Sequence, residues 1–289
     1  MTPDIHAFYD PTTHTITYLV ADPDTKRAAI IDPVLDYDPK TARISTHSVD
    51  SVLALAAVHG LTIGYVLETH AHADHLTAAH HIREATGATI VIGKHIGEVQ
   101  KIFGPLFNPG GDEPGPGVFD HLVEDGDQLT LGKLAIQVIH TPGHTAADVT
   151  YLIEDAAFVG DTLFMPDYGT ARTDFPGGDA KTLFRSIRRI LDLPPETRLF
   201  TGHDYRPDGG RTEPAWESTV AEQRVKNIHI HHGVHEAEFV AMRQARDASL
   251  EPPVLILPSL QVNIRAGQLP PAAANGKIYL QLPVNVLGA

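Results

Sequence analysis

The sequence predicts an α+β protein in which two layers of β-sheet are covered by helices. Strand-like runs recur along the chain with helical segments between them, and this order of strands first and helices at intervals occurs twice. The 289 residues are 42% hydrophobic and 20% charged, a composition that supports a real hydrophobic core. Their number suits one large domain or two small ones. A disordered tail, a disulfide-stapled module and a coiled coil are excluded by this composition.

The first third of the chain alternates between strands and helices. Ile16, Tyr18 and Val20 alternate with polar neighbours, as on a half-buried strand. Gly60 and Gly87 follow two segments with helical periodicity, and glycine commonly ends a helix. In chain order, the expected elements are a strand at Ala28–Ile31, a helix at Val49–His59, a strand at Ile63–Glu68, a helix at His75–Thr86 and a strand at Thr89–Ile92.

The rest of the chain repeats the pattern after a segment rich in glycine and proline, Gly104–Gly117, which predicts a loop. From Pro252 the chain is rich in proline and predicts an extended arm. We therefore expect a catalytic domain over residues 1–250 and an arm over 251–289 packed on it. The intervening elements are expected as strands at Gln128–Leu131, Leu134–His140, Val149–Ile153, Ala156–Val159 and Leu199–Thr201, and as helices at Lys181–Leu191 and Glu213–Asn227.

Charge and cysteine content exclude several classes of function. The 22 basic and 36 acidic residues give a net charge of −14, which disfavours nucleic acid as a partner. The absence of cysteine excludes disulfides, thiolate nucleophiles, iron–sulfur clusters and sulfur transfer of the rhodanese type. No apolar run is long enough to cross a bilayer and the N-terminus lacks a signal segment, so we expect a cytoplasmic protein without a membrane partner.

Histidine, of which the chain has 18, is concentrated where the strand Ile63–Glu68 ends. His70, His72, Asp74 and His75 follow this strand within six residues. In extended chain, residues two apart face the same side, so His70 and His72 can point into one pocket. Imidazole and carboxylate are common metal ligands. The alternative, in which Asp74 only caps a helix in a polar loop, is disfavoured by this density of ligand types.

Three further strand ends carry a residue of the same kind. His144 follows the strand Leu134–His140, Asp161 follows Ala156–Val159, and His203 follows Leu199–Thr201. Each of them comes directly after a glycine. Alone, any one would more often be a turn residue. Together with the first cluster they predict loops that converge on one pocket at a sheet edge.

The ordered set His70-x-His72-x-Asp74-His75, His144, Asp161 and His203 resembles the metallo-β-lactamase superfamily. The resemblance covers about residues 5 to 230 and implies an αββα sandwich with the metal site between the sheet edges. It also implies that hydrolysis at a centre of two metal ions, with Asp161 bridging them, is the default chemistry.

Two segments narrow the resemblance to the persulfide dioxygenases. These are Arg172-Thr-Asp-Phe175 and Gly202-His-Asp-Tyr205, where glyoxalase II enzymes usually carry Gly-Arg-x-Phe-Glu and Gly-His-Glu-Tyr. Met165–Ala171 and Leu257–Arg265 resemble a bacterial branch of that group.

This resemblance implies one Fe(II) per chain, held by His70, His144 and Asp161. Two histidines and one carboxylate on one face leave positions for a persulfide sulfur and O₂. The implied reaction oxidises glutathione persulfide to sulfite and glutathione. The remaining residues, His72, Asp74, His75 and His203, would then orient ligands and water by hydrogen bonds. The family also implies a homodimer.

Two alternatives stay open. The full ligand set for a second ion is present, so a hydrolase of glutathione thioesters with two zinc ions, or with zinc and iron, is the second hypothesis. A non-catalytic metal-dependent sensor is the third. Glutathione carries two carboxylates, so cations should line the pocket. Arg172 and Arg211 are candidates for this contact, although Arg172 can equally pair with Asp174, and Tyr205 can orient substrate or simply pack.

Overall fold

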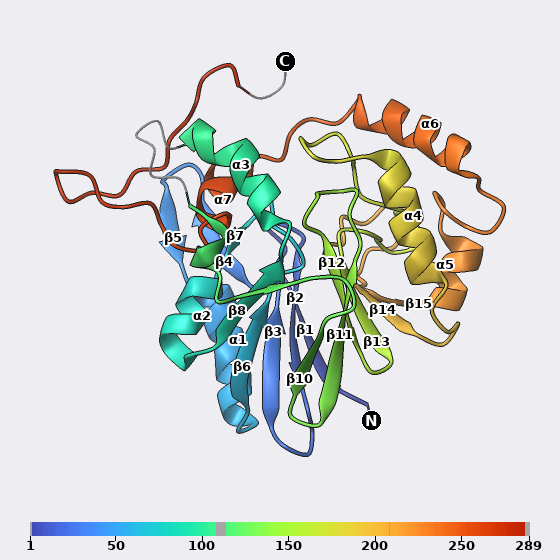
Figure 1. The fold of residues 1–289 in the computed structure, drawn as a ribbon, viewed down its shortest axis with the longest axis horizontal. Helices are drawn as coiled ribbons and strands as arrows, with labels where there is room; N and C mark the ends of the chain where they lie inside the picture. Colours follow the sequence, from blue (N-terminus) through green and yellow to red (C-terminus); the bar gives the residue numbers. More distant parts are fainter. Residues whose placement is uncertain (1, 108–113, 208, 287–289) are drawn as a thin grey trace.

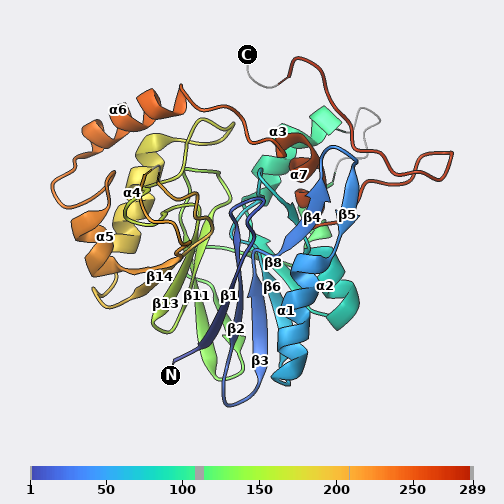
Figure 2. The same ribbon diagram turned by 180° about the vertical axis from the view of Figure 1, so that it is seen from behind.

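The fold is an αββα sandwich, as predicted. Figure 1 shows the computed structural model of the chain, which describes residues 2–107, 114–207 and 209–286. Two six-stranded sheets lie face to face, and helices cover the outer face of each sheet, as the two opposite views show (Figures 1 and 2).

The first sheet has the strand order β1-β2-β3-β6-β8-β9. Its strands β3, β6, β8 and β9 are parallel, while β2 is antiparallel to both of its neighbours, β1 and β3. A small sheet of order β5-β4-β7 lies beside it. The elements are β1 (Asp4–Tyr9), β2 (Ile16–Ala21), β3 (Arg27–Ile31), β4 (Val34–Asp38), β5 (Arg43–Ser45), α1 (His47–Val58), β6 (Thr62–Leu67), β7 (Leu76–Thr77), α2 (Ala79–Thr86), β8 (Thr89–Gly93), α3 (Ile96–Phe107), η1 (Pro116–Val118) and β9 (His121–Val123).

The second sheet has the strand order β10-β11-β12-β13-β14-β15. It is antiparallel except for the pair β13 and β14. Helix α7 returns to the first half of the molecule, where it contacts β7 and α3. The elements are β10 (Gln128–Leu131), β11 (Leu134–His140), β12 (Val149–Ile153), β13 (Ala156–Gly160), α4 (Ala180–Leu191), β14 (Arg198–Thr201), β15 (Glu217–Thr219), α5 (Val220–Lys226), α6 (Glu236–Asp247) and α7 (Ile256–Asn263).

The strand predicted around Ile16, Tyr18 and Val20 is present as β2, but it is buried at all six positions, so its predicted half-burial is wrong. Tyr18 points into the core between the sheets, where its ring contacts Phe158 and Phe200. Leu19 points the other way, into the core beneath the helices. The polar neighbour Thr17 is also buried, and its hydroxyl donates to the carbonyl of Asp32 at 2.8 Å. A strand covered on both faces gives no alternation of buried and exposed positions.

Most predicted elements are present, but four segments differ. Residues 75–86 contain the strand β7 before α2, so Asp74 caps no helix. Residues 213–227, predicted as one helix, contain the strand β15, and only 220–226 are helical. The predicted loop at 104–117 begins inside α3; residues 108–113 lie outside the described part. The predicted arm contains the helix α7.

In the described ranges, no helix combines the length and apolarity that crossing a membrane requires.

Candidate metal centre

Four strands that precede the predicted ligands end at one edge of the sandwich. The strand β6 leads into the loop with His70, β11 into the loop with His144, β13 to Asp161 and β14 to His203. In the second sheet, β11 and β13 run in the same direction because each is antiparallel to β12, and β14 is parallel to β13. The backbone of Val149 donates to the carbonyl of Thr69 at 2.9 Å and ties the two sheets together at this edge.

The glycines that precede two of the ligands have a structural reason. Gly160 has a φ of +51°, and a Cβ on it would lie 2.6 Å from the hydroxyl oxygen of Thr69. Gly143 has a φ of +136°, and a Cβ there would lie 2.3 Å from the backbone nitrogen of Leu183. Only glycine combines this backbone conformation with such a close approach. The pattern of strand, glycine and ligand in the sequence therefore reflects tight turns into the site.

One group of ligand atoms consists of His70, His144 and Asp161, all buried. Oδ2 of Asp161 lies 3.8 Å from Nε2 of His70 and 3.6 Å from Nε2 of His144. Nδ1 of His144 lies 2.9 Å from the carbonyl oxygen of Arg172, which can only accept, so Nδ1 carries the proton. The lone pair on Nε2 of His144 then faces Asp161. This is the tautomer that a metal ligand needs.

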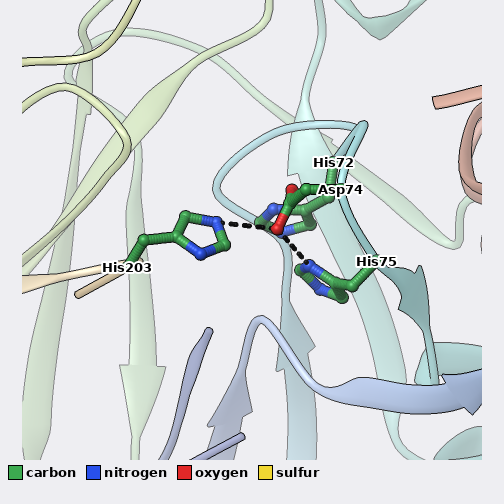
Figure 3. A group of neighbouring side chains, drawn as sticks. All are labelled: His72, Asp74, His75 and His203. Atoms are coloured by element: carbon green, nitrogen blue, oxygen red, sulfur yellow. Dashed lines mark hydrogen bonds and ion pairs between the residues drawn. The ribbon is translucent and has the colours of Figure 1, made fainter. Parts of the chain in front are cut away.

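A second group consists of His72, Asp74, His75 and His203 (Figure 3). Oδ2 of Asp74 lies 3.2 Å from Nε2 of His203 and 3.5 Å from Nδ1 of His75. Oδ1 of Asp161 lies 3.4 Å from Nε2 of His203, so the two carboxylate oxygens of Asp161 face one group each. The structure thus brings together all seven predicted ligand-type residues.

A third cluster surrounds the far side of His72 and was not predicted. Nε2 of His72 lies 3.1 Å from Asp32 and 3.5 Å from Glu68, and both carboxylates are buried. Burial disfavours the charged imidazole and lowers the pKa of His72. The two carboxylates have the larger combined effect and raise this pKa well above its ordinary value. The two carboxylates therefore favour a proton on Nε2 of His72, the nitrogen that faces them. The only sign of Asp32 in the sequence is its position directly after the strand Ala28–Ile31.

The buried ligand atoms lack hydrogen-bond partners within the described part of the chain. Nε2 of His70, Nε2 of His75 and Oδ1 of Asp161 make no hydrogen bond there. Burial raises the pKa of Asp161 to about 7, and burial together with the neighbouring imidazoles lowers the pKa of His70 well below its ordinary value. Unsatisfied buried nitrogen and carboxylate atoms are costly unless a cation binds them. The donor set therefore fits a metal ion, as predicted.

A cavity of about 470 Å³ adjoins the centre, where it is lined by Asp74, His144 and Asp161. Aromatic and aliphatic side chains form much of its wall, including those of Tyr37, Phe164, Phe175, Val254 and Leu255. A site of this size with apolar walls and a few charged groups suits a small organic molecule.

The three predicted substrate contacts have different surroundings. Arg172 lines the cavity but is paired with Asp174 at 2.6 and 2.7 Å, the alternative considered for it. Tyr205 also lines the cavity and stacks on His203 with ring centroids 5.3 Å apart. Arg211 is not among the residues that line this cavity.

The guanidinium of Arg211 binds the carboxylates of Asp204 and Asp167 instead. Arg211 therefore has a structural role, because Asp204 is buried and its charge needs a cation as partner.

Two cations that the sequence did not indicate line the cavity: Arg243, which pairs with Asp247, and Arg246. Arg246 comes from α6 and has its guanidinium 5.9 Å from the centre of the Tyr168 ring. Among the described residues it has no carboxylate partner within ion-pair distance. No motif or spacing marks it, since it lies in a helix that follows the last of the ligand loops, that of His203.

Comparison with known proteins identifies relatives along the whole chain. The family model of the metallo-beta-lactamase superfamily matches residues 11–203. A probable metallo-hydrolase of Burkholderia pseudomallei is 52% identical over 294 residues, which cover 98% of this chain and 99% of the relative. Glyoxylase B2 of Dictyostelium discoideum is 45% identical over 287 residues, which cover 98% and 97%.

Two further relatives carry the name ETHE1. Mitochondrial persulfide dioxygenase ETHE1 of Homo sapiens is 30% identical over 273 residues, which cover 93% of this chain and 91% of the relative. The crystal structure of ETHE1 from Myxococcus xanthus superposes with a TM-score of 0.74 at 32% identity and covers 92% of this chain and 100% of that one.

Proposed function

Because the chain is an enzyme of the metallo-beta-lactamase superfamily, we propose that it is a persulfide dioxygenase. Its substrates are glutathione persulfide and O₂, and its cofactor is one Fe(II) held by His70, His144 and Asp161. The net reaction converts the persulfide, O₂ and water into glutathione and sulfite, with release of two protons. The relatives named ETHE1, one of them a persulfide dioxygenase, support this choice.

The observation that carries the proposal is the set of two imidazoles and one carboxylate beside the cavity. His144 and Asp161 both line the cavity, and among the described residues that ligand group consists of these two and His70. Fe(II) in such a site supplies the electron transfer that O₂ chemistry requires. The second group supports the proposal as well, because Asp74 lies within ion-pair distance of both His75 and His203. These three side chains can therefore partner one another when no second ion is bound.

The chain's own residues have separate tasks in this reaction. The carbonyl of Arg172 fixes the tautomer of His144, and the Asp32 and Glu68 carboxylates favour a proton on Nε2 of His72. Phe164, Phe175 and their apolar neighbours exclude water from the reacting sulfur.

The experiment measures metal content and oxygen uptake of anaerobically purified protein. We expect about one iron per chain, O₂ consumption that depends on glutathione persulfide, and release of one sulfite for each O₂. Two metal ions per chain without oxygen uptake would reject the proposal.

The second candidate is a hydrolase of glutathione thioesters with two metal ions. The observation that favours it is that His72, Asp74, His75 and His203 offer ligand atoms within 4.8 Å of one another, with Asp161 between both groups. Relatives named metallo-hydrolase and Glyoxylase B2 support it. Turnover of S-lactoylglutathione by protein with two zinc ions would establish this candidate. The homodimer, the cytoplasmic location and the boundary at residue 250 stay predictions of the sequence.

We expect alanine at position 246 to weaken binding of glutathione persulfide. Arg246 is the cavity cation without a carboxylate partner among the described residues, so it is free to bind a carboxylate of the substrate. Steady-state kinetics of Arg246→Ala should show KM raised about tenfold, equivalent to ~1.4 kcal/mol, with kcat little changed. Arg185→Ala removes an exposed arginine that does not line the cavity and should leave KM unchanged. Equal KM values for both variants would remove Arg246 from the substrate site.

A further inference from the structure

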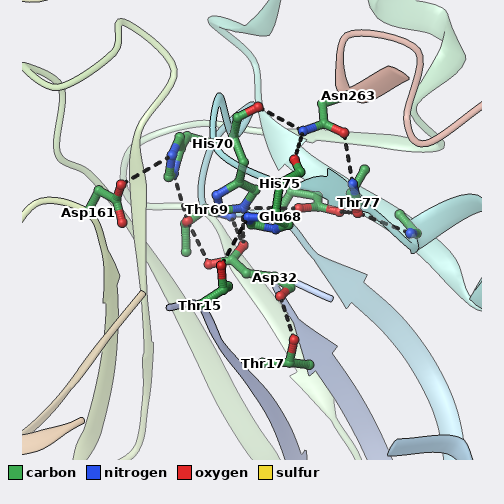
Figure 4. Close-up of polar contacts among 12 residues, drawn as sticks. Thr15, Thr17, Asp32, Glu68, Thr69, His70, His75, Thr77, Asp161 and Asn263 are labelled. Carbon is green, nitrogen blue, oxygen red and sulfur yellow. Dashed lines mark hydrogen bonds and ion pairs between the residues drawn. The ribbon is translucent and has the colours of Figure 1, made fainter. Parts of the chain in front are cut away.

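The side chain of Asn263, at the end of α7, reaches the loop that carries the metal ligands (Figure 4). Its Nδ2 donates to the backbone carbonyls of His72 at 2.8 Å and His75 at 2.7 Å. Its Oδ1 accepts from the backbone nitrogen of Thr77 at 2.8 Å. One side chain from the C-terminal segment therefore holds three backbone groups of the loop, although 186 to 191 residues separate the partners.

The amide of Asn263 is fully used by these contacts. It has two N–H donors and one carbonyl oxygen, and each has a partner in the loop. The residue is 3% exposed, so water cannot replace the loop as a partner. Loss of the amide would leave the carbonyls of His72 and His75 without these bonds in a buried position.

The contacts fix the segment whose side chains form the second ligand group. Both His72 and His75 are held at their carbonyls by the same nitrogen atom, which sets the distance between them and the course of the chain through Asp74. A second chain of contacts runs from Thr77 to the imidazole of His72. The hydroxyl of Thr77 donates to Glu68, and Oε2 of Glu68 lies 3.5 Å from Nε2 of His72. Backbone and imidazole of His72 are thus both positioned by groups linked to Asn263.

We propose that Asn263 is a positioning residue of the metal centre and that α7 belongs to the centre. It organises the ligand loop before the metal binds, so the metal does not have to order the loop itself. This inference rests on the proposed metal centre but not on the choice between dioxygenase and hydrolase. The predicted arm is then a functional part of the site.

The test compares two variants in the same helix. Asn263→Leu keeps the approximate volume and removes all three bonds. Gln261→Met is the matched control: Gln261 is also buried, and its amide bonds the carbonyls of Leu257 and Gln281 rather than the ligand loop. The probe is Co²⁺, bound to metal-free full-length protein under anaerobic conditions. Affinity is measured by chelator competition and coordination by the visible absorption bands of Co²⁺.

We expect Asn263→Leu to bind Co²⁺ about 10- to 100-fold more weakly and with shifted absorption bands. Gln261→Met should match the unmodified protein in Co²⁺ affinity and in absorption bands, even if its melting temperature is lower. Asn263→Ser retains one hydrogen-bond donor and replaces the leucine variant if that variant does not fold. Its Co²⁺ affinity should lie between those of Asn263→Leu and the unmodified protein. The proposal would be overturned if the Asn263 and Gln261 variants had equal Co²⁺ affinities and equal absorption bands. It would also be overturned if the unmodified protein bound no Co²⁺. Intact Co²⁺ binding without persulfide oxidation would count against the proposed function alone.

Discussion

Asparagine in place of Asp161 is expected to remove the metal ion and to lower activity by on the order of 10³-fold, since metal binding supplies several kcal/mol to such reactions. Oδ2 of Asp161 faces His70 and His144, and Oδ1 faces His203. The amide keeps the shape of the carboxylate but loses its charge, so it binds a cation far more weakly. Metal analysis of Asp161→Asn after purification should give well below one ion per chain.

Asp148→Asn is the matched control for this variant. Asp148 is buried as Asp161 is, and burial raises the pKa of both carboxyls to about 7. It lies 3.8 Å from Nδ1 of His70, the nitrogen turned away from Asp161, and it accepts hydrogen bonds from the backbone and hydroxyl of Thr145. We expect this variant to keep its metal ion, with affinity reduced about 10- to 100-fold at most. Equal metal loss in both variants would show that neutralising any buried carboxylate is sufficient and that Asp161 is not a special ligand.

Removal of the Asp247 carboxylate should destabilise the protein by about 3–5 kcal/mol, because it leaves the guanidinium of Arg243 buried without a counter-charge. Arg243 and Asp247 are 1% and 3% exposed, and their closest contact is 2.6 Å. Asp247 also accepts from the backbone of Thr173 at 2.9 Å, and Arg243 donates to the carbonyl of Thr170 at 3.0 Å. The pair therefore fastens α6 to the segment beside the cavity. Equilibrium unfolding of Asp247→Ala in urea measures the loss.

The control is Glu236→Ala in the same helix. Glu236 pairs with Arg185, whose side chain is 70% exposed, so the loss should be about 0–1 kcal/mol. The double variant Arg243→Met/Asp247→Leu should regain much of the stability, because it removes both buried charges together. Similar losses in Asp247→Ala and Glu236→Ala would refute a special contribution of the buried pair.

The sequence pattern predicted two layers of sheet covered by helices because many of the strands and helices have local signals, and the family resemblance implied the αββα sandwich. Runs such as Ala28–Ile31 and Leu134–His140 are apolar enough to form strands wherever they pack. The wrong assignments share a cause. The strand β7 has two residues and β15 has three, and such short strands exist only because a neighbouring strand pairs with them.

The residues of the candidate site likewise fall into those that the sequence predicted and those that it did not. All seven metal-ligating candidates could be predicted, because each follows a strand end and two of them follow glycines with positive φ. The supporting residues could not. Asp32, Arg246 and Asn263 lie far from the ligand loops in sequence and carry no motif, and only the packed structure places them beside the centre.

The family and the candidate ligand residues can be inferred from the sequence alone. The contacts of Asn263 with the ligand loop and the identity of the cations at the cavity come only from the three-dimensional structure. The physical reason is that strand ends and tight turns are encoded by neighbours in the chain. Buried hydrogen bonds such as those of Asn263 depend instead on how distant segments pack.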